Sequence, residues 1–137
     1  MKRLVLLFIA TCLLGGTVWA QDKPDKRERK KNLVVKEWNT DARGAGKRLD
    51  HQTTYNADGK KIEEIEYNAD GQKWRKRYEY TGDKCVKEMV YNDRNKLVSI
   101  KKFEYNELGK KKVQYNYDAK GKLLTIKTFE YISRHAE

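Results

Sequence analysis

The sequence predicts an all-β protein built as an antiparallel up-and-down meander of about seven to eight strands. The first observation is a tyrosine followed by a turn, repeated at intervals of 11 to 14 residues, which is one strand plus one tight turn. The second is an alternation of side-chain character between the turns, the period of a strand with two different faces. The repeat tyrosines are Tyr55, Tyr67, Tyr80, Tyr91, Tyr105, Tyr117 and Tyr131.

The expected strands lie between segments with turn chemistry. Residues 56–59 and 68–71 both read Asn-Ala-Asp-Gly, in which glycine supplies the left-handed residue of a type I turn with a G1 bulge. Asn95 replaces that glycine in the fourth turn, because asparagine also tolerates positive φ. Gly82-Asp83 predicts a two-residue turn, and the longer segment 39–46 leaves the first strand least well defined. The expected strands are residues 33–38, 47–55, 60–67, 72–80, 84–92, 96–105, 110–117 and 122–131.

Alternation predicts that all the repeat tyrosines lie on one face, together with the residue two positions before each of them. Those preceding residues are mostly apolar or aromatic, whereas the opposite face is charged and solvated. Lysines follow the same face as the tyrosines, so we expect a mixed aromatic and basic surface there. The candidate binding face comprises Trp74, Lys76, Tyr78, Lys87, Lys101, Phe103, Tyr105, Lys127 and Phe129.

The lysines of this face favour an open, twisted, largely single-layer sheet. Closure into a small eight-stranded barrel, the alternative, would point Lys76, Lys87, Lys101 and Lys127 into an interior just wide enough for side chains. In an open sheet their stems lie over neighbouring rings and their ammonium groups stay in water. Charged residues make up 37% of the chain, nearly as much as the 38% that is hydrophobic, so a thick two-layer core is not expected.

The ends of the chain predict export. Residues 1–20 resemble a signal peptide, with Lys2 and Arg3 before an apolar run and a cleavage site after Ala20. The protein is therefore expected to be periplasmic or secreted. A lipoprotein anchored through Cys12 is the less favoured alternative, because no small residue of the usual lipobox kind precedes that cysteine. Residues 21–32 are expected to be a flexible charged leader, 33–131 the β-hairpin repeat domain and 132–137 a C-terminal tail.

The residues that could act in catalysis or bind a metal are too far apart in the sequence to indicate such a site. His51 and His135 have no second ligand at metal spacing, and Cys85 has no Cys-x-x-Cys partner. We therefore expect no enzymatic activity, no cofactor and no metal, and no later segment is apolar enough to span a bilayer. The net charge of +11 favours anionic envelope partners such as acidic glycans or lipopolysaccharide over nucleic acid, although it also fits ordinary solubility.

One turn carries a resemblance to a known family. Residues 117–123, Tyr-Asp-Ala-Lys-Gly-Lys-Leu, resemble the Tyr-Asp-x-x-Gly-Arg-Leu signature of YD repeats, the RHS-type repeats of bacterial secreted and surface proteins. Residues 55–60 and 67–71 match more loosely, with Asn in place of Asp. The resemblance implies a β-sheet shell or carbohydrate binding. The chain departs from it in having about seven units and Lys122 in place of arginine, and it looks more like small exported repeat proteins of gut Bacteroidetes.

Two functional hypotheses follow. The first is a non-enzymatic cell-envelope repeat protein that acts as an interaction or structural module through its Tyr/Phe/Lys face, on an envelope protein or a second copy of itself. The second is a carbohydrate- or polyanion-binding protein, in which rings stack on sugars and lysines meet acidic groups. The lysines of the candidate binding face distinguish the two hypotheses, because the cores of protein–protein interfaces are depleted in lysine whereas a site for an acidic glycan needs it.

Overall fold

The computed structural model describes residues 25–134. The predicted signal peptide, its cleavage site after Ala20, Cys12 and the start of the leader lie outside the described residues, as do His135 and the last residues of the tail.

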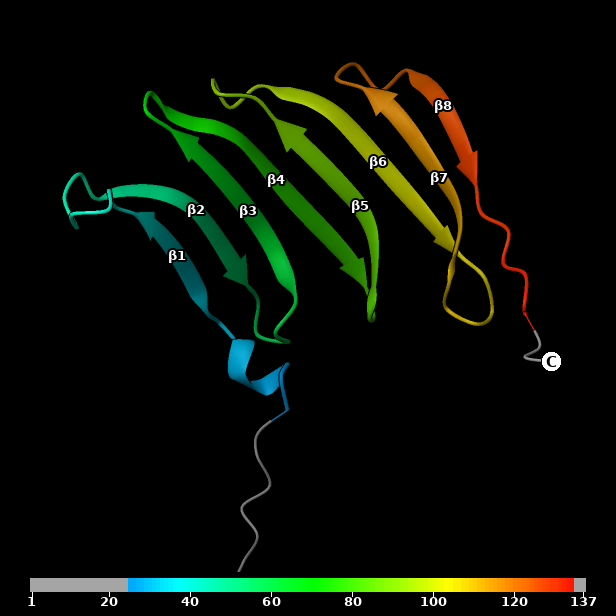
Figure 1. Ribbon diagram of the computed structural model, residues 1–137. Helices are drawn as coiled ribbons and strands as arrows, with labels where there is room; N and C mark the ends of the chain where they lie inside the picture. The colour runs from blue at the N-terminus through cyan, green and yellow to red at the C-terminus, as the bar shows by residue number, and fades with distance from the viewer. Residues whose placement is uncertain (1–24, 135–137) are drawn as a thin grey trace, which may run out of the picture.

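The described chain forms one antiparallel sheet in which each strand pairs with the next along the sequence (Figure 1). β1 and β8 form the two edges and, within residues 25–134, do not pair with each other. The predicted open meander is therefore confirmed, and the alternative of a closed barrel is wrong. The strands are β1 (Val34–Asn39), β2 (Arg48–Tyr55), β3 (Lys61–Asn68), β4 (Gly71–Thr81), β5 (Lys84–Tyr91), β6 (Leu97–Tyr105), β7 (Lys111–Asp118) and β8 (Leu123–Thr128).

The turns have the predicted chemistry. Gly59 has a φ of 70°, and its N–H donates to the carbonyl of Asn56, which closes a type I turn with a G1 bulge. Asn95 takes the glycine position with a φ of 57°. Thr81 pairs directly with Lys84, so Gly82-Asp83 is a two-residue turn as expected. The side chains of Asn56, Asn92 and Asp118 each accept two backbone N–H groups of their own turn.

A bulge beside each of the first six repeat tyrosines corrects the prediction that they share a face. Tyr80 pairs with Cys85 while Glu79 pairs with Lys87, so β5 contains one extra residue at that point. The same shift recurs at Tyr55, Tyr67, Tyr91, Tyr105 and Tyr117. Since one residue of register moves a side chain to the opposite side of a sheet, each bulge reverses the face of the next tyrosine.

The pairing of β4 with β5 makes this reversal explicit. Directly opposed residues share a face, and Tyr78 opposes Glu88 whereas Arg75 opposes Tyr91. Tyr80 lies two residues after Tyr78 and therefore on the side opposite to Tyr91. We call the side that carries Trp74, Tyr78 and Phe103 face A, and the side that carries Ile65, Arg75 and Met89 face B. Tyr55, Tyr80 and Tyr105 lie on face A, and Tyr67, Tyr91 and Tyr117 lie on face B.

The sheet is a single layer with a thin apolar centre. The buried hydrophobic residues are Ile65 on face B and Phe103 on face A, at 9% and 7% exposure, with Thr53 the buried polar residue. Both faces thus mix rings with charges, and the predicted division into an aromatic face and a charged face is wrong. Stability therefore comes from strand pairing and from the cover that long polar side chains give to the rings.

The described part of the leader contains a short turn beneath the β2–β3 hairpin (Figure 1). Glu28–Lys30 form a 3₁₀ turn, η1, and the N–H of Asn32 donates to the carbonyl of Asn56. The guanidinium of Arg27 lies 3.2 Å from the carboxylate of Asp83. This part of the leader is therefore folded onto the sheet end.

Candidate interaction face

Face A carries most of the predicted binding residues, and Lys87 is the exception. Lys101 opposes Glu88, which puts it on the side of Tyr78, and Lys127 opposes Gln114 in the row of Phe103. Lys87 instead opposes Lys102 and lies 3.4 Å from the carboxylate of Glu79 on face B. The β5 bulge moves it there. The residues gathered on face A are Trp74, Lys76, Tyr78, Lys101, Phe103, Tyr105, Lys127 and Phe129.

The aromatic rings of face A are covered by ammonium groups of the same chain. The Nζ atom of Lys76 lies 4.8 Å from the ring centre of Trp74, and that of Lys127 lies 5.1 Å from Phe129. Lys111 stands over Phe103 at 4.0 Å. Such contacts stabilise an exposed site by about 0.5–1 kcal/mol each. Sequence reasoning anticipated lysines beside rings in general and missed Lys111, because the β7 bulge turns it towards this face.

A polar cluster occupies face A across β1 to β4. His51 lies with Nε2 3.2 Å from Glu64 and Nδ1 3.4 Å from Glu37, and its ring meets that of Trp74 edge-on. The hydroxyl of Tyr78 donates to Glu64 at 2.7 Å. The sequence placed His51 on a strand but gave no sign of these partners, since they come from neighbouring strands.

The pKa values in this cluster follow from burial and hydrogen bonding. Burial acts to raise the pKa of Glu64, but hydrogen bonds from Tyr78 and Lys61, with the charges of Lys61 and His51, outweigh it and hold the pKa below its usual value. Burial and the bond to Glu64 raise the pKa of Tyr78 well above that of a free tyrosine. The cluster therefore keeps a carboxylate ionised and a phenol protonated at neutral pH.

From Tyr80 onwards, every second repeat tyrosine bonds through its hydroxyl to a backbone carbonyl of the neighbouring strand, a contact we call a latch. The latches lie at the lower sheet end in Figure 1, where the β2–β3, β4–β5 and β6–β7 turns lie. The hydroxyl of Tyr80 donates to the carbonyl of Lys61 at 2.7 Å, and that of Tyr105 donates to the carbonyl of Cys85 at 2.6 Å. Tyr131 repeats the contact with Lys111 at 2.7 Å. Each accepting carbonyl lies near the start of a strand, beside the bulge of that strand. The bulge and the latch therefore recur together along the sheet.

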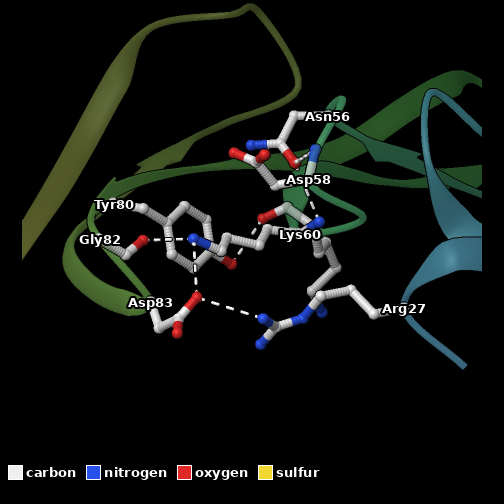
Figure 2. Close-up of polar contacts among 8 residues, drawn as sticks. Arg27, Asn56, Asp58, Lys60, Tyr80, Gly82 and Asp83 are labelled. Carbon is white, nitrogen blue, oxygen red and sulfur yellow. Dashed lines mark hydrogen bonds and ion pairs between the residues drawn. The ribbon is translucent and has the colours of Figure 1, made fainter. Parts of the chain in front are cut away.

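A lysine completes each latch. Lys84 stands 5.6 Å from the ring centre of Tyr105, and its Nζ donates to the carbonyl of Gly109 at 2.9 Å. Lys60 has the corresponding position over the Tyr80 ring and donates to the carbonyl of Gly82 (Figure 2). The lysines thus tie each lower turn to the next one along the sheet.

The corner between η1 and the β4–β5 turn is an open polar hollow of about 650 Å³. Figure 2 shows its charges paired within the protein: Lys60 and Arg27 both reach the carboxylate of Asp83, at 3.2 Å each. The hydrogen bond from Lys60, followed by the charges of Arg27 and Lys60, lowers the pKa of Asp83. These charges of the hollow are therefore paired with one another within the protein, and the pairs face solvent.

Within residues 25–134, no group of three His, Cys, Asp or Glu side chains is arranged to hold a metal ion. Cys85 is a free thiol whose pKa is raised, mainly by burial, which works against its ionisation as a nucleophile. Over the same span, no helix has the length and apolar character needed to cross a membrane.

These features define a class of structure, an open single-layer β-meander with a two-strand latch repeat. Comparison with family models gives no match, and neither does comparison with curated protein sequences. Among solved structures, the chain is similar to a mutant of Staphylococcus aureus TarM in complex with fondaparinux, alpha-GlcNAc-glycerol and UDP. The TM-score is 0.29 and the identity 16%, over 74% of this chain and 20% of that one. The present chain thus spans about a fifth of that protein.

Proposed function

We propose that this protein is a non-enzymatic, exported cell-envelope repeat protein that acts as an interaction or structural module, with face A as its contact surface. The rings covered by lysines support this proposal most directly. Because Trp74, Phe103 and Phe129 already carry ammonium groups of the same chain, a sugar ring could stack on them only by displacing those lysines. A protein surface can instead pack against the lysine stems and the ring edges together.

Site-specific photo-crosslinking in intact envelopes tests this proposal. A photoreactive side chain replaces Lys76 or Lys101 on face A, and Lys87 on face B provides the matched control. We expect a crosslinked species of defined mass from the two face A positions and none from Lys87. Equal crosslinking from both faces, or none from Lys76 and Lys101, would refute the assignment of face A.

A second candidate function is polyanion binding, which the unneutralised lysines favour. Within the described residues, the ammonium groups of Lys76 and Lys127 lie over rings and have no carboxylate within 4.0 Å. With a net charge of +11, this leaves positive charge on face A for an acidic glycan or lipopolysaccharide.

Elution from a heparin column separates the two functions. The triple change Lys76→Gln, Lys101→Gln and Lys127→Gln lowers the charge of face A, and the same triple change at Lys36, Lys87 and Lys102 lowers the charge of face B equally. Polyanion binding through face A predicts earlier salt elution for the first variant than for the second. Identical elution would show only the effect of net charge and would refute a polyanion site on face A.

A further inference from the structure

A mostly apolar hollow of about 460 Å³ lies on face B over β5, β6 and β7. A row of directly opposed residues crosses it, from Lys87 through Lys102 to Tyr115, and directly opposed residues share a face. Tyr117, two residues after Tyr115, also lines the hollow, as does Val86, the extra residue of the β5 bulge. Rings and apolar side chains beside a few charged groups are the usual lining of a site for a small molecule.

The ring of Tyr115 is not covered by a cation of the same chain. Most rings of the sheet are covered, as Tyr117 is by Lys102 at 5.2 Å. Among residues 25–134, the tyrosines without such a cation are Tyr67 and Tyr115, and of these two Tyr115 lines the hollow. The hydroxyl of Tyr115 donates to Glu104 at 3.1 Å, which fixes the position of the ring. The hollow therefore offers an aromatic ring on which a planar group can stack without displacing a lysine.

The charges around the hollow leave one ammonium group without a carboxylate. Lys87 lies 3.4 Å from the carboxylate of Glu79, and Glu104 accepts the hydroxyl of Tyr115. Among the described residues, Lys102 has no carboxylate within 4.0 Å of its Nζ atom. Lys87 and Lys102 are also directly opposed, and opposed like charges destabilise a sheet. An anionic group of a ligand would pair with Lys102 and reduce this repulsion.

We propose that the hollow binds a small aromatic carboxylate, with the ligand's ring stacked on Tyr115 and its carboxylate at the ammonium group of Lys102. Aromatic rings attract one another in offset or edge-on arrangements beyond the effect of the area that they bury. An aromatic ring fits this lining better than a sugar does, because the described side chains that line the hollow include no amide for sugar hydroxyls. A sulfated polysaccharide such as heparin has no aromatic ring, so this site on face B does not depend on either function proposed for face A.

NMR titration of the full chain with three probes tests the proposal. Indole-3-acetate carries a ring and a carboxylate, tryptamine carries the same ring with an ammonium group, and acetate carries the carboxylate alone. We expect indole-3-acetate to bind with a Kd of about 1 mM and to shift the resonances of Tyr115 and Lys102, and the other two probes to bind about tenfold more weakly or not at all. Equal binding of tryptamine would show stacking without recognition of charge, and equal binding of acetate would show an adventitious anion only. Either result, or no binding of indole-3-acetate up to about 10 mM, overturns the proposal.

Two pairs of variants locate the site. Lys102→Gln should weaken the binding of indole-3-acetate about three- to fivefold, the effect of losing an exposed ion pair, whereas Lys101→Gln, with the same net charge but on face A, should leave it unchanged. Tyr115→Leu removes the ring and should abolish binding, whereas Tyr67→Leu removes the other uncovered tyrosine ring and should not. Because Lys102 is exposed, its substitution tests the site even if loss of the Tyr115 ring unfolds the chain. Equal affinities for Lys102→Gln and Lys101→Gln, with circular dichroism unchanged, would overturn the proposal.

Discussion

The tyrosine latch can be tested by removing one oxygen atom. Tyr105 donates its hydroxyl to the carbonyl of Cys85 at 2.6 Å, and burial raises the pKa of that hydroxyl. Tyr105→Phe keeps the ring and its cation–π contact with Lys84 but removes the hydrogen bond. A hydrogen bond of this kind contributes about 0.5–1.5 kcal/mol to the free energy of unfolding. We therefore expect Tyr105→Phe to lower that free energy by about 1 kcal/mol.

Tyr117→Phe is the matched control. Tyr117 also lies under a lysine, Lys102 at 5.2 Å, but among the described residues its hydroxyl has no hydrogen-bond partner. Its substitution should change the unfolding free energy by less than about 0.5 kcal/mol.

Urea denaturation followed by tryptophan fluorescence measures both variants. With an m value of about 2 kcal/mol/M, a loss of 1 kcal/mol moves the midpoint by about 0.5 M. Equal midpoints for Tyr105→Phe and Tyr117→Phe, with unchanged m, would refute the view that the latch stabilises the sheet.

Three further predictions use other features of the chain. Because the pKa of Glu64 is held below the 4.5 of an unperturbed glutamate, the stabilising effect of its carboxylate is present above that pH and is lost as pH falls through the lower folded-state pKa. Glu64→Gln should therefore flatten the fall in stability below pH 4.5, and an unchanged acid profile would contradict this. Gly109 and Gly121 both have positive φ, but a methyl group on Gly109 would also lie 2.7 Å from Lys84 Nζ. Gly109→Ala should therefore lower the thermal unfolding temperature more than Gly121→Ala does. Equal losses would argue against a stabilising role for the hydrogen bond from Lys84 to the carbonyl of Gly109. Intact-mass analysis of exported protein should show a chain that starts at Gln21, and a lipid adduct on Cys12 would overturn cleavage after Ala20.

The strands and their order could be predicted from the sequence because the residues of each turn mark where one strand ends and the next begins. Asn95 illustrates this, since the need for positive φ at one turn position is visible from a single residue type. The faces could not be predicted in the same way. Whether Lys87 lies on face A or face B depends on a bulge opposite Tyr80, and the residues around it have no bulge-specific signal.

The polar cluster on face A shows the same limit. His51, Glu64 and Tyr78 come from three strands, and their contacts depend on register across two ladders. A sequence pattern identifies residues within one strand but not the neighbours that a shifted register brings to them. The eight face A residues were predicted as a group because their positions relative to the bulges happen to agree, and Lys87 was misplaced because its position does not.

The bulges also restrict how such a chain can change its length. A segment of one strand and one turn reverses both the chain direction and the face of the next tyrosine, so gain or loss of a single segment would set every later latch on the wrong side of the sheet. Two consecutive segments restore both direction and face, and they preserve contacts such as that from Tyr105 at the end of β6 to Cys85 in β5, which recur at every second strand. The unit that can be duplicated or deleted without repacking the remainder is therefore a pair of strands, about twice as long as the repeat visible in the sequence.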